Sequence, residues 1–257
     1  MSDTYSAPLV SVIIPVLHLT RPINAKRFFM PRYTIREVLR DLREHVTLPF
    51  EVIVISNGTD SELIEFVRTH DAIDKYCINS VNAGVGRSWN MGAQLAEAEV
   101  LCFLNDDVAV GRGGMEALYH ALLGSADVGE VGPAGSRWRG AQHERYAGEQ
   151  EPEDADVISG FCFLLKSELF HQLGGLDIAY TPAGFEEIDL SFAIRKAGYR
   201  CLVIPKLPIH HYHHHGVSAY RTEIKYLKTS IDTHVLHQRN KTYFMKKWGI
   251  SDEGVGE

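Results

Sequence analysis

The sequence has few cysteines, no excess of basic charge and no long apolar segment. Its four cysteines stand singly, without the paired spacing of a metal site or the density of a disulfide scaffold. We therefore expect Cys77, Cys102, Cys162 and Cys201 to be reduced core residues. The 26 basic and 33 acidic residues give a net charge of -7 and are spread along the chain, which argues against a nucleic acid as partner.

No apolar stretch reaches the length of a transmembrane helix, and the first segment, MSDTYSAPLV, lacks the basic and apolar regions of a signal peptide. The chain also has no internal repeat. We therefore expect a protein of the cytoplasm, with the inner face of the membrane as a second location that leaves peripheral membrane association open. The sequence does not predict an oligomeric state.

Short apolar segments alternate with amphipathic ones, a pattern typical of strand–helix–strand units and a mostly parallel sheet. Strands are expected at Leu9–Leu17, Phe50–Ser56, Tyr76–Val81 and Val100–Leu104, and helices at Ile35–Val46, Ser61–His70 and Arg87–Ala98. A chain of 257 residues has enough apolar content for one large core. We predict a single α/β domain with a Rossmann-like central sheet flanked by helices.

Two segments do not fit this alternation. The basic and aromatic insert HLTRPINAKRFFMPR, at residues 18–32, is longer than a typical strand-to-helix loop. It either covers a substrate or is an ordinary surface loop. The polar stretch Gly132–Asp156 is predicted to be irregular and to contribute specificity.

Two adjacent carboxylates follow the apolar segment VLCFL, in the run Asn105, Asp106 and Asp107. A buried carboxylate is costly unless a cation, hydrogen-bond donors or water lie close to it. Ligands of open α/β sheets bind at the carboxyl ends of strands, and Mg²⁺ or Mn²⁺ binds through one or two carboxylates plus substrate phosphates. The pair therefore suits a metal-bound nucleotide. Capping of the following turn is the alternative.

A second group of acids, Glu186, Glu187 and Asp189, follows a glycine at position 184 and opens a predicted helix. Acidic residues in a first helical turn are favoured by the helix dipole alone. Placed beside the ligand crevice of a sheet, one of them would equally serve as a general base. The sequence leaves both interpretations open.

Five histidines lie in the stretch IHHYHHHGVS, after the expected strand that ends near Pro205. Alternate residues of an extended segment point the same way, which would group His211, His213 and His215. Imidazole is a common metal ligand, so a Zn²⁺ site is one interpretation. Most of these histidines are more simply structural or solvated.

In order and spacing, these segments resemble the family-two glycosyltransferases of GT-A fold, from about Val10 to Trp248. The matching segments are VSVIIPV, VIVISNGTD, NAGVGRSWNMGAQLAEAEVLCFLNDDV, SGFCFLLKSELFHQLGGLD, GFEEIDLSFAIRKAGYR, VIPKLPIHH and HQRNKTYFMKKW. The resemblance implies one GT-A domain over residues 1–257. It implies a nucleotide-binding half at about 9–130 and a smaller acceptor and catalytic half at about 131–250.

The resemblance also implies a donor site for a nucleotide-diphosphate sugar. In relatives the positions of Pro15, Val16, Ser56 and Asn57 border the nucleobase, those of Asn82, Gly84, Arg87 and Asn90 line the donor pocket, and Asn105 and Asp106 belong to the DXD-type motif that binds ribose and metal. The family often has Asp at the position of Ser56, so base recognition departs from the family here.

For the reacting centre, the resemblance implies Asp107 as the direct ligand of Mn²⁺ or Mg²⁺. His211 is the histidine that spacing favours as a further ligand, with His213 as the second choice. Ser159 and Gly160 would run beneath the sugar and acceptor. Glu187 occupies the place of the catalytic base, which is usually Asp, with Glu186 and Asp189 as neighbouring candidates.

The activity implied is metal-dependent, inverting transfer of a hexosyl or deoxyhexosyl group to a hydroxyl, in bacterial glycan or glycoconjugate assembly. A glycan, a lipid-linked saccharide or a protein would be the acceptor. A nucleotidyltransferase is the first alternative, although PVLHLTRPIN lacks the glycine-rich phosphate loop of that class. A non-catalytic module that binds nucleotide sugars is the second, because fold similarity alone does not establish activity.

Overall fold

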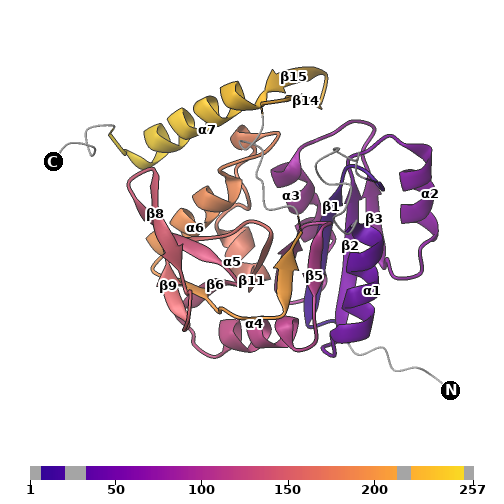
Figure 1. Cartoon of the computed structure of the whole chain (residues 1–257), viewed down its shortest axis with the longest axis horizontal. Helices are drawn as coiled ribbons and strands as arrows, with labels where there is room; N and C mark the ends of the chain where they lie inside the picture. Colours follow the sequence, from indigo (N-terminus) through magenta and orange to yellow (C-terminus); the bar gives the residue numbers. More distant parts are fainter. Residues whose placement is uncertain (1–6, 21–32, 213–220, 252–257) are drawn as a thin grey trace.

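The computed structural model describes residues 7–20, 33–212 and 221–251, built around an eight-stranded sheet (Figure 1). The strand order is β3 (Lys75–Ile78), β2 (Phe50–Ser56), β1 (Val10–Val16), β4 (Val100–Leu104), β11 (Cys162–Lys166), β6 (Val128–Gly132), β12 (Arg200–Val203) and β9 (Glu153–Ala155). The first four strands are mutually parallel, whereas β11 and β9 run antiparallel to their neighbours. The predicted α/β fold with a mostly parallel central sheet is confirmed.

Helices cover both faces of this sheet. The helices are α1 (Ile35–His45), α2 (Ser61–Thr69), α3 (Val85–Leu95), α4 (Gly114–Leu123), α5 (Ser167–Gln172), α6 (Glu186–Lys196) and α7 (Thr233–Trp248). Side chains alternate along a strand, so β1 directs Val12 and Ile14 to one core, which α1, α2 and α4 cover, and Ile13 to the other, with α3, α5 and α6. The burial of both faces explains why these strands are continuously apolar.

Most predicted elements differ from the observed ones by a few residues. The strand expected at Tyr76–Val81 is β3, which begins at Lys75 and ends at Ile78. The third helix begins at Val85, two residues earlier than expected, because the amide of Val85 donates to the carbonyl of Pro182 and Gly84 adopts a positive φ of 86°. It ends at Leu95, where the following residue is extended.

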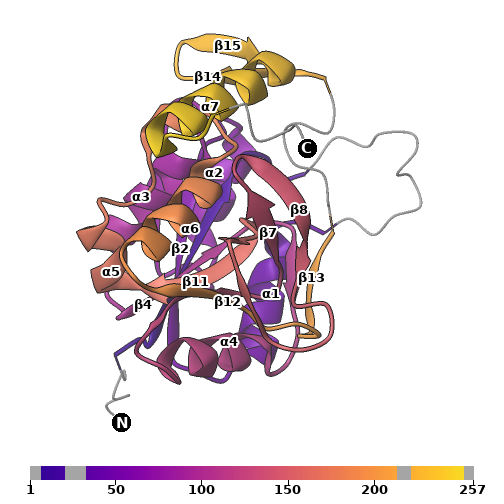
Figure 2. The ribbon, with the colours of Figure 1, turned by 90° about the vertical axis from the view of Figure 1, so that its left-hand side faces the viewer.

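The stretch predicted to be irregular, Gly132–Asp156, is instead largely β-structure, so that prediction was wrong. It contains β7 (Gly135–Arg139) and β8 (Gln142–Ala147), which form a hairpin (Figure 2), and then β9. With β10 (Val157–Ile158), the hairpin makes a three-stranded sheet. The outer strand β8 exposes all its residues from 142 to 146, and therefore has no alternating apolar pattern to reveal it.

The C-terminal part crosses back over the molecule. The hairpin of β14 (Glu223–Tyr226) and β15 (Thr229–Asp232) leads directly into α7, and Figure 1 shows both above α3 and α6. Helix α7 buries Phe244 against Phe185 and Ile188 near the start of α6. None of the helices in the described residues is long and apolar enough to cross a membrane.

Two sequence predictions fall mainly on residues outside the described part of the chain. These are the insert at residues 18–32, of which the structure describes only 18–20, and the histidines at positions 213–215. A covering role for the insert and a ligand role for His213 both stay predictions.

Candidate functional site

The strand order reverses between β1 and β4, which is where an open α/β sheet forms its ligand crevice. The chain proceeds outward from β1 to β2 and β3, then returns to add β4 on the other side of β1. A sheet of this kind binds ligands where the order reverses, outside the carboxyl ends of the strands. Pro15 and Val16 end β1 there, and Asn105, Asp106 and Asp107 follow β4.

Asp107 is the most deeply placed carboxylate of this edge, with 2% of its surface exposed, and Asp106 is also buried. The short strands β5 (Val108–Val110) and β13 (Ile209–His211) pair antiparallel, and this register sets His211 opposite Val108. The imidazole Nε2 of His211 lies 3.3 Å from Oδ1 of Asp107. Two residues far apart in the sequence thus meet at the crevice.

Neighbouring groups hold this pair in place. The ring of Phe161 stacks on the imidazole of His211, with centroids 4.8 Å apart and planes 12° from parallel. The backbone amide of Tyr212 donates to the carbonyl of Asp107 at 3.1 Å. The orientation of His211 towards Asp107 is therefore supported from two sides.

The donor chemistry of this pair fits a divalent cation. Mn²⁺ accepts both carboxylate oxygen and imidazole nitrogen, and sites of this type leave positions for water and substrate phosphate. Within the described residues, no group of three or more His, Cys, Asp or Glu is arranged to hold a metal ion. The described part of the chain thus offers two converging ligands.

Glu187 lies in the first turn of α6, against the chain segment that follows β10. A Cβ atom added to Gly160 would lie 2.9 Å from Cγ of Glu187, so the glutamate side chain would have to shift to admit it. Glu187 is half-buried, whereas Glu186 is 4% exposed. Gly160 therefore leaves the space that the Glu187 side chain fills.

Burial and mutual repulsion give Glu186 and Glu187 different tendencies to ionise. Burial, together with the charge of Glu187, raises the pKa of Glu186 to about 8. Burial also raises the pKa of Glu187. The more exposed of two coupled carboxyls ionises first, so Glu186 stays protonated near neutral pH and Glu187 is the member of the pair that ionises.

Asp189, the third acid, makes structural contacts instead. Its carboxylate accepts hydrogen bonds from the Tyr180 hydroxyl at 3.0 Å and from the Trp248 indole at 2.8 Å. It also pairs with the Lys247 ammonium at 2.7 Å. These contacts tie α6 to the C-terminal end of α7, and we assign Asp189 no role as a base.

The two residues at the end of β2 are used within the protein. The hydroxyl of Ser56 donates to the Gly58 carbonyl and the side chain is fully buried. The amide of Asn57 donates to Ser88 at 2.7 Å, and its oxygen accepts from the Asn79 side chain at 3.0 Å. Ser56 and Asn57 therefore shape the loop at this edge.

Of the four residues predicted along the donor pocket near α3, three also make contacts within the protein: Asn82, Gly84 and Asn90. Asn90 forms two hydrogen bonds with the backbone of Leu176, and Asn82 accepts from the amide of Gly84. Arg87 differs, because its Nε is buried and has no hydrogen-bond partner among the described residues. A buried guanidinium nitrogen without a hydrogen-bond partner is suited to binding an anionic ligand.

A large cleft at the same edge includes a segment that the sequence did not single out. It measures about 1140 Å³ and lies between the ends of β1, β2 and β3 and the β14–β15 hairpin. Before the turn at Leu227 and Lys228, the apolar Ile224 and the aromatic Tyr226 alternate with the charged Glu223 and Lys225. That weak alternation was the one available signal for the hairpin.

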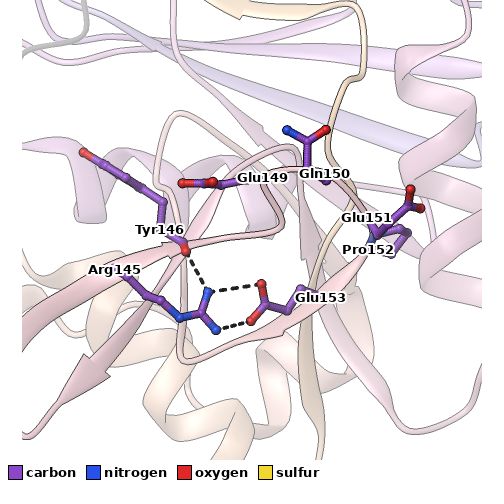
Figure 3. A pocket seen from close by; sticks show the side chains of 7 residues that line it. All are labelled: Arg145, Tyr146, Glu149, Gln150, Glu151, Pro152 and Glu153. Atoms are coloured by element: carbon purple, nitrogen blue, oxygen red, sulfur yellow. Dashed lines mark hydrogen bonds and ion pairs between the residues drawn. The ribbon is translucent and has the colours of Figure 1, made fainter.

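A second, smaller cleft of about 420 Å³ lies on the β8–β9 connection (Figure 3). Its lining includes Arg145, which donates to the Glu153 carboxylate at 2.5 Å and to the Tyr146 carbonyl at 2.9 Å. The charged groups at its centre are thus paired with each other. It contains none of the residues predicted for the site, and we do not include it.

Known proteins of similar structure share this architecture. The crystal structure of GalNAc-T7 with UDP, GalNAc and Mn²⁺ matches with a TM-score of 0.67 and 16% identity, covering 93% of this chain and 48% of that one. The mannosyltransferase PcManGT from Pyrobaculum calidifontis, in complex with GDP-Man and Mn²⁺, matches with a TM-score of 0.54 and 20% identity, covering 79% and 56%. The fold is therefore that of the GT-A glycosyltransferases.

Sequence comparisons point the same way. The uncharacterized protein y4gI of Sinorhizobium fredii (strain NBRC 101917 / NGR234) is 26% identical over 270 residues, which cover 88% of this chain. The chain spans only 28% of the length of that relative. The family model described as glycosyl transferase family 2 matches residues 31–174, more than half of the chain. The chain belongs to glycosyl transferase family 2.

Proposed function

We propose that this chain is a metal-dependent, inverting glycosyltransferase that moves a sugar from a nucleoside-diphosphate sugar to a hydroxyl acceptor. The observation that carries the proposal is the convergence of Asp107 and His211, whose side chains lie 3.3 Å apart at the carboxyl edge of the sheet. The two structural relatives, whose structures hold Mn²⁺ and UDP or GDP-Man, support the same type of donor.

Asp107 and His211 would hold the cation, with Asp106 beside them. When bound, Mn²⁺ or Mg²⁺ neutralises the charge on the diphosphate and so makes it a better leaving group. Arg87, whose Nε has no partner among the described residues, would bind a diphosphate oxygen. All four residues would belong to the donor side of the site.

Glu187 would accept the proton of the acceptor hydroxyl. The oxygen then bonds to the anomeric carbon as the bond to the diphosphate breaks on the opposite face, and the anomeric configuration inverts. A base with a raised pKa takes a proton more readily than an ordinary carboxylate. Glu186, protonated at neutral pH, would limit the negative charge beside it.

We further propose a hexosyl or deoxyhexosyl donor and a role in bacterial glycan or glycoconjugate assembly, with a saccharide, lipid-linked or protein acceptor. The bacterial source of the 26% identical relative supports this setting. An acceptor that remains at a membrane surface is compatible with the described structure.

The test is to incubate the protein with Mn²⁺ and a panel of nucleotide sugars and hydroxyl acceptors, and to identify the nucleotide product. Free nucleoside diphosphate is expected, and the product should have the inverted anomeric configuration by NMR. A Glu187→Gln variant should bind the donor normally but lose about 10²- to 10⁴-fold in transfer. Release of pyrophosphate would identify a nucleotidyltransferase instead, and turnover of no donor would contradict the proposal.

A further inference from the structure

The β14–β15 hairpin lies apart from the central sheet. Its two strands pair only with each other among the described residues, with Ile224 opposite Ile231 and Tyr226 opposite Thr229. An isolated two-stranded hairpin is marginally stable in water, so its position depends on contacts with the rest of the chain.

Both ends of the hairpin are attached. At the tip, the amide of Leu227 donates to the Asn82 carbonyl at 2.8 Å, and the side-chain amide of Asn82 donates to the Lys225 carbonyl at 3.1 Å. At the base, Asp232 caps the N-terminus of α7 by accepting from the His234 amide at 2.9 Å. The hairpin is therefore held across the loop that follows β3.

This placement closes the outer side of the large cleft. The inner side consists of residues that follow the ends of β1, β2 and β3, while residues 223–230 of the hairpin form the outer side. A cleft of about 1140 Å³ is large enough for a nucleoside. It lies on the β1–β2–β3 half of the sheet, next to the β4 end that presents Asp107.

The hairpin presents an aromatic ring and two positive charges to this cleft. Along β14, Ile224 and Tyr226 are half-buried while Glu223 and Lys225 are exposed, so the half-buried pair faces the molecule. Tyr226, Lys225 and Lys228 all line the cleft. A tyrosine ring is suited to stacking on a nucleobase, and the lysines to attracting an anionic nucleotide.

We propose that the β14–β15 hairpin is the outer wall of the nucleoside end of the donor site, and that Tyr226 stacks on the nucleobase. A diphosphate held at Asp107 and Arg87 would extend its nucleoside along the ends of β1 and β2 into the cleft. Asn57 lines the same cleft, but its side-chain amide is hydrogen-bonded to Ser88 and Asn79, so the hairpin supplies further contacts to the base. This inference rests on the proposed function.

The test measures binding of UDP, GDP, ADP, CDP and inorganic pyrophosphate to the full chain by isothermal titration calorimetry in the presence of Mn²⁺. Tyr226→Ala should weaken binding of the preferred nucleoside diphosphate by about tenfold or more. Its affinity for pyrophosphate, which has no base, should not change. Tyr226→Phe should retain the wild-type affinity because the ring remains.

The matched control is Tyr146→Ala, which removes a tyrosine that is 67% exposed on β8 and should leave nucleotide affinity unchanged. Tyr226→Leu keeps an apolar side chain against the molecule, and should therefore preserve the hairpin if the alanine variant loosens it. Unchanged melting temperatures would show that the variants are folded. In the leucine variant, the loss of nucleotide affinity should persist.

Two failures are distinguishable. If the wild-type chain binds nucleoside diphosphates but the alanine and leucine variants at position 226 bind them equally well, the role of the hairpin is overturned and the proposed function stands. Equal losses for nucleotide and pyrophosphate overturn stacking as well. If the wild-type chain binds none of the nucleoside diphosphates, the proposed function fails together with this inference.

Discussion

The side-chain amide of Asn240 on α7 donates to the carbonyl oxygen of Gly184 at 2.7 Å. The same nitrogen lies 2.9 Å from the Tyr180 carbonyl and 3.0 Å from that of Ala183. Asn240 thus holds together the backbone of the turn that immediately precedes Glu186 and Glu187. Its side chain is 1% exposed, so water does not replace these bonds if they are lost.

We expect Asn240→Ala to lower the free energy of unfolding by about 1–3 kcal/mol, because buried carbonyls lose their donor. It should also lower kcat, since the turn that positions Glu187 is released, while the affinity for nucleoside diphosphate stays within about twofold. Urea unfolding, calorimetry and transfer assays would measure the three effects. The control is Gln238→Ala on the exposed side of α7. A loss of stability with unchanged kcat would limit Asn240 to a structural role.

A second prediction concerns Glu130, which is fully buried on β6 and accepts a hydrogen bond from the Ser191 hydroxyl at 2.7 Å. Burial raises the pKa of Glu130 to about 8 from its ordinary value of 4.5. Between these pH values the unfolded chain has lost the proton and the folded chain keeps it, so stability falls as pH rises. The slope from this one group is about 1.4 kcal/mol per pH unit at most.

Glu130→Gln cannot ionise, and its free energy of unfolding should therefore fall less steeply than that of the wild type from pH 5 to pH 8. Urea unfolding at several pH values would measure the difference in slope. Glu65→Gln, at an exposed position of α2, should follow the wild-type slope. Parallel slopes for wild type and Glu130→Gln would show that Glu130 is already ionised in the folded protein.

For the donor site, Asp107→Ala is expected to abolish the Mn²⁺-dependent binding of nucleoside diphosphate. A ligand at 100 times its Kd stabilises a protein by about 2.7 kcal/mol, so the variant should lose the increase in melting temperature that Mn²⁺ and nucleotide give the wild type. Without these ligands its melting temperature should be nearly unchanged or raised, because a buried charge has been removed. Wild-type affinity in this variant would exclude Asp107 as a ligand.

The neighbouring histidines offer a matched pair. His211 faces Asp107, whereas His210, on the other face of β13, is exposed. His211→Ala should weaken Mn²⁺-dependent nucleotide binding by about tenfold or more, the effect that loss of a metal ligand or its supporting contact commonly has. His210→Ala should change it little. Equal effects in titration calorimetry would show that the stretch acts through its structure alone.

The parts of the fold that the sequence predicts well are those in which burial dictates the pattern. Strand β2 was predicted with its observed bounds, Phe50–Ser56, because both of its faces are covered. The β7–β8 hairpin was not predicted, since β8 has no buried face before Ala147. The C-terminal hairpin is stabilised by contacts with Asn82, which lies 143 residues before Lys225 in the sequence. The local sequence of the hairpin does not reveal these contacts.

The sequence also predicts some site residues better than others. The resemblance to the family singled out Asp107 and His211, which the structure brings together. It also singled out Asn57 and Asn90, whose side-chain amides donate hydrogen bonds to the Ser88 hydroxyl and to the Leu176 carbonyl, respectively. Whether an asparagine faces a ligand or the protein interior depends on distant partners, which residue type alone does not reveal.

The final prediction tests the close approach of Gly160 to Glu187. In Gly160→Ala the new Cβ would lie 2.9 Å from Cγ of Glu187, so the glutamate must move. We expect kcat to fall by more than tenfold while the affinity for nucleoside diphosphate is retained, because Asp107 and His211 are not displaced. Transfer assays at saturating donor, together with titration calorimetry, would separate these two effects.

Gly86→Ala on α3 is the matched control, because its new Cβ would lie 3.7 Å from the nearest atom, Cβ of Glu186, an ordinary contact. Alanine is also the better helix former by about 1 kcal/mol, so this variant should be as stable as the wild type or more stable. If Gly160→Ala transfers sugar at the wild-type rate, the base does not depend on the space at Gly160. The assignment of Glu187 would then rest on the Glu187→Gln variant alone.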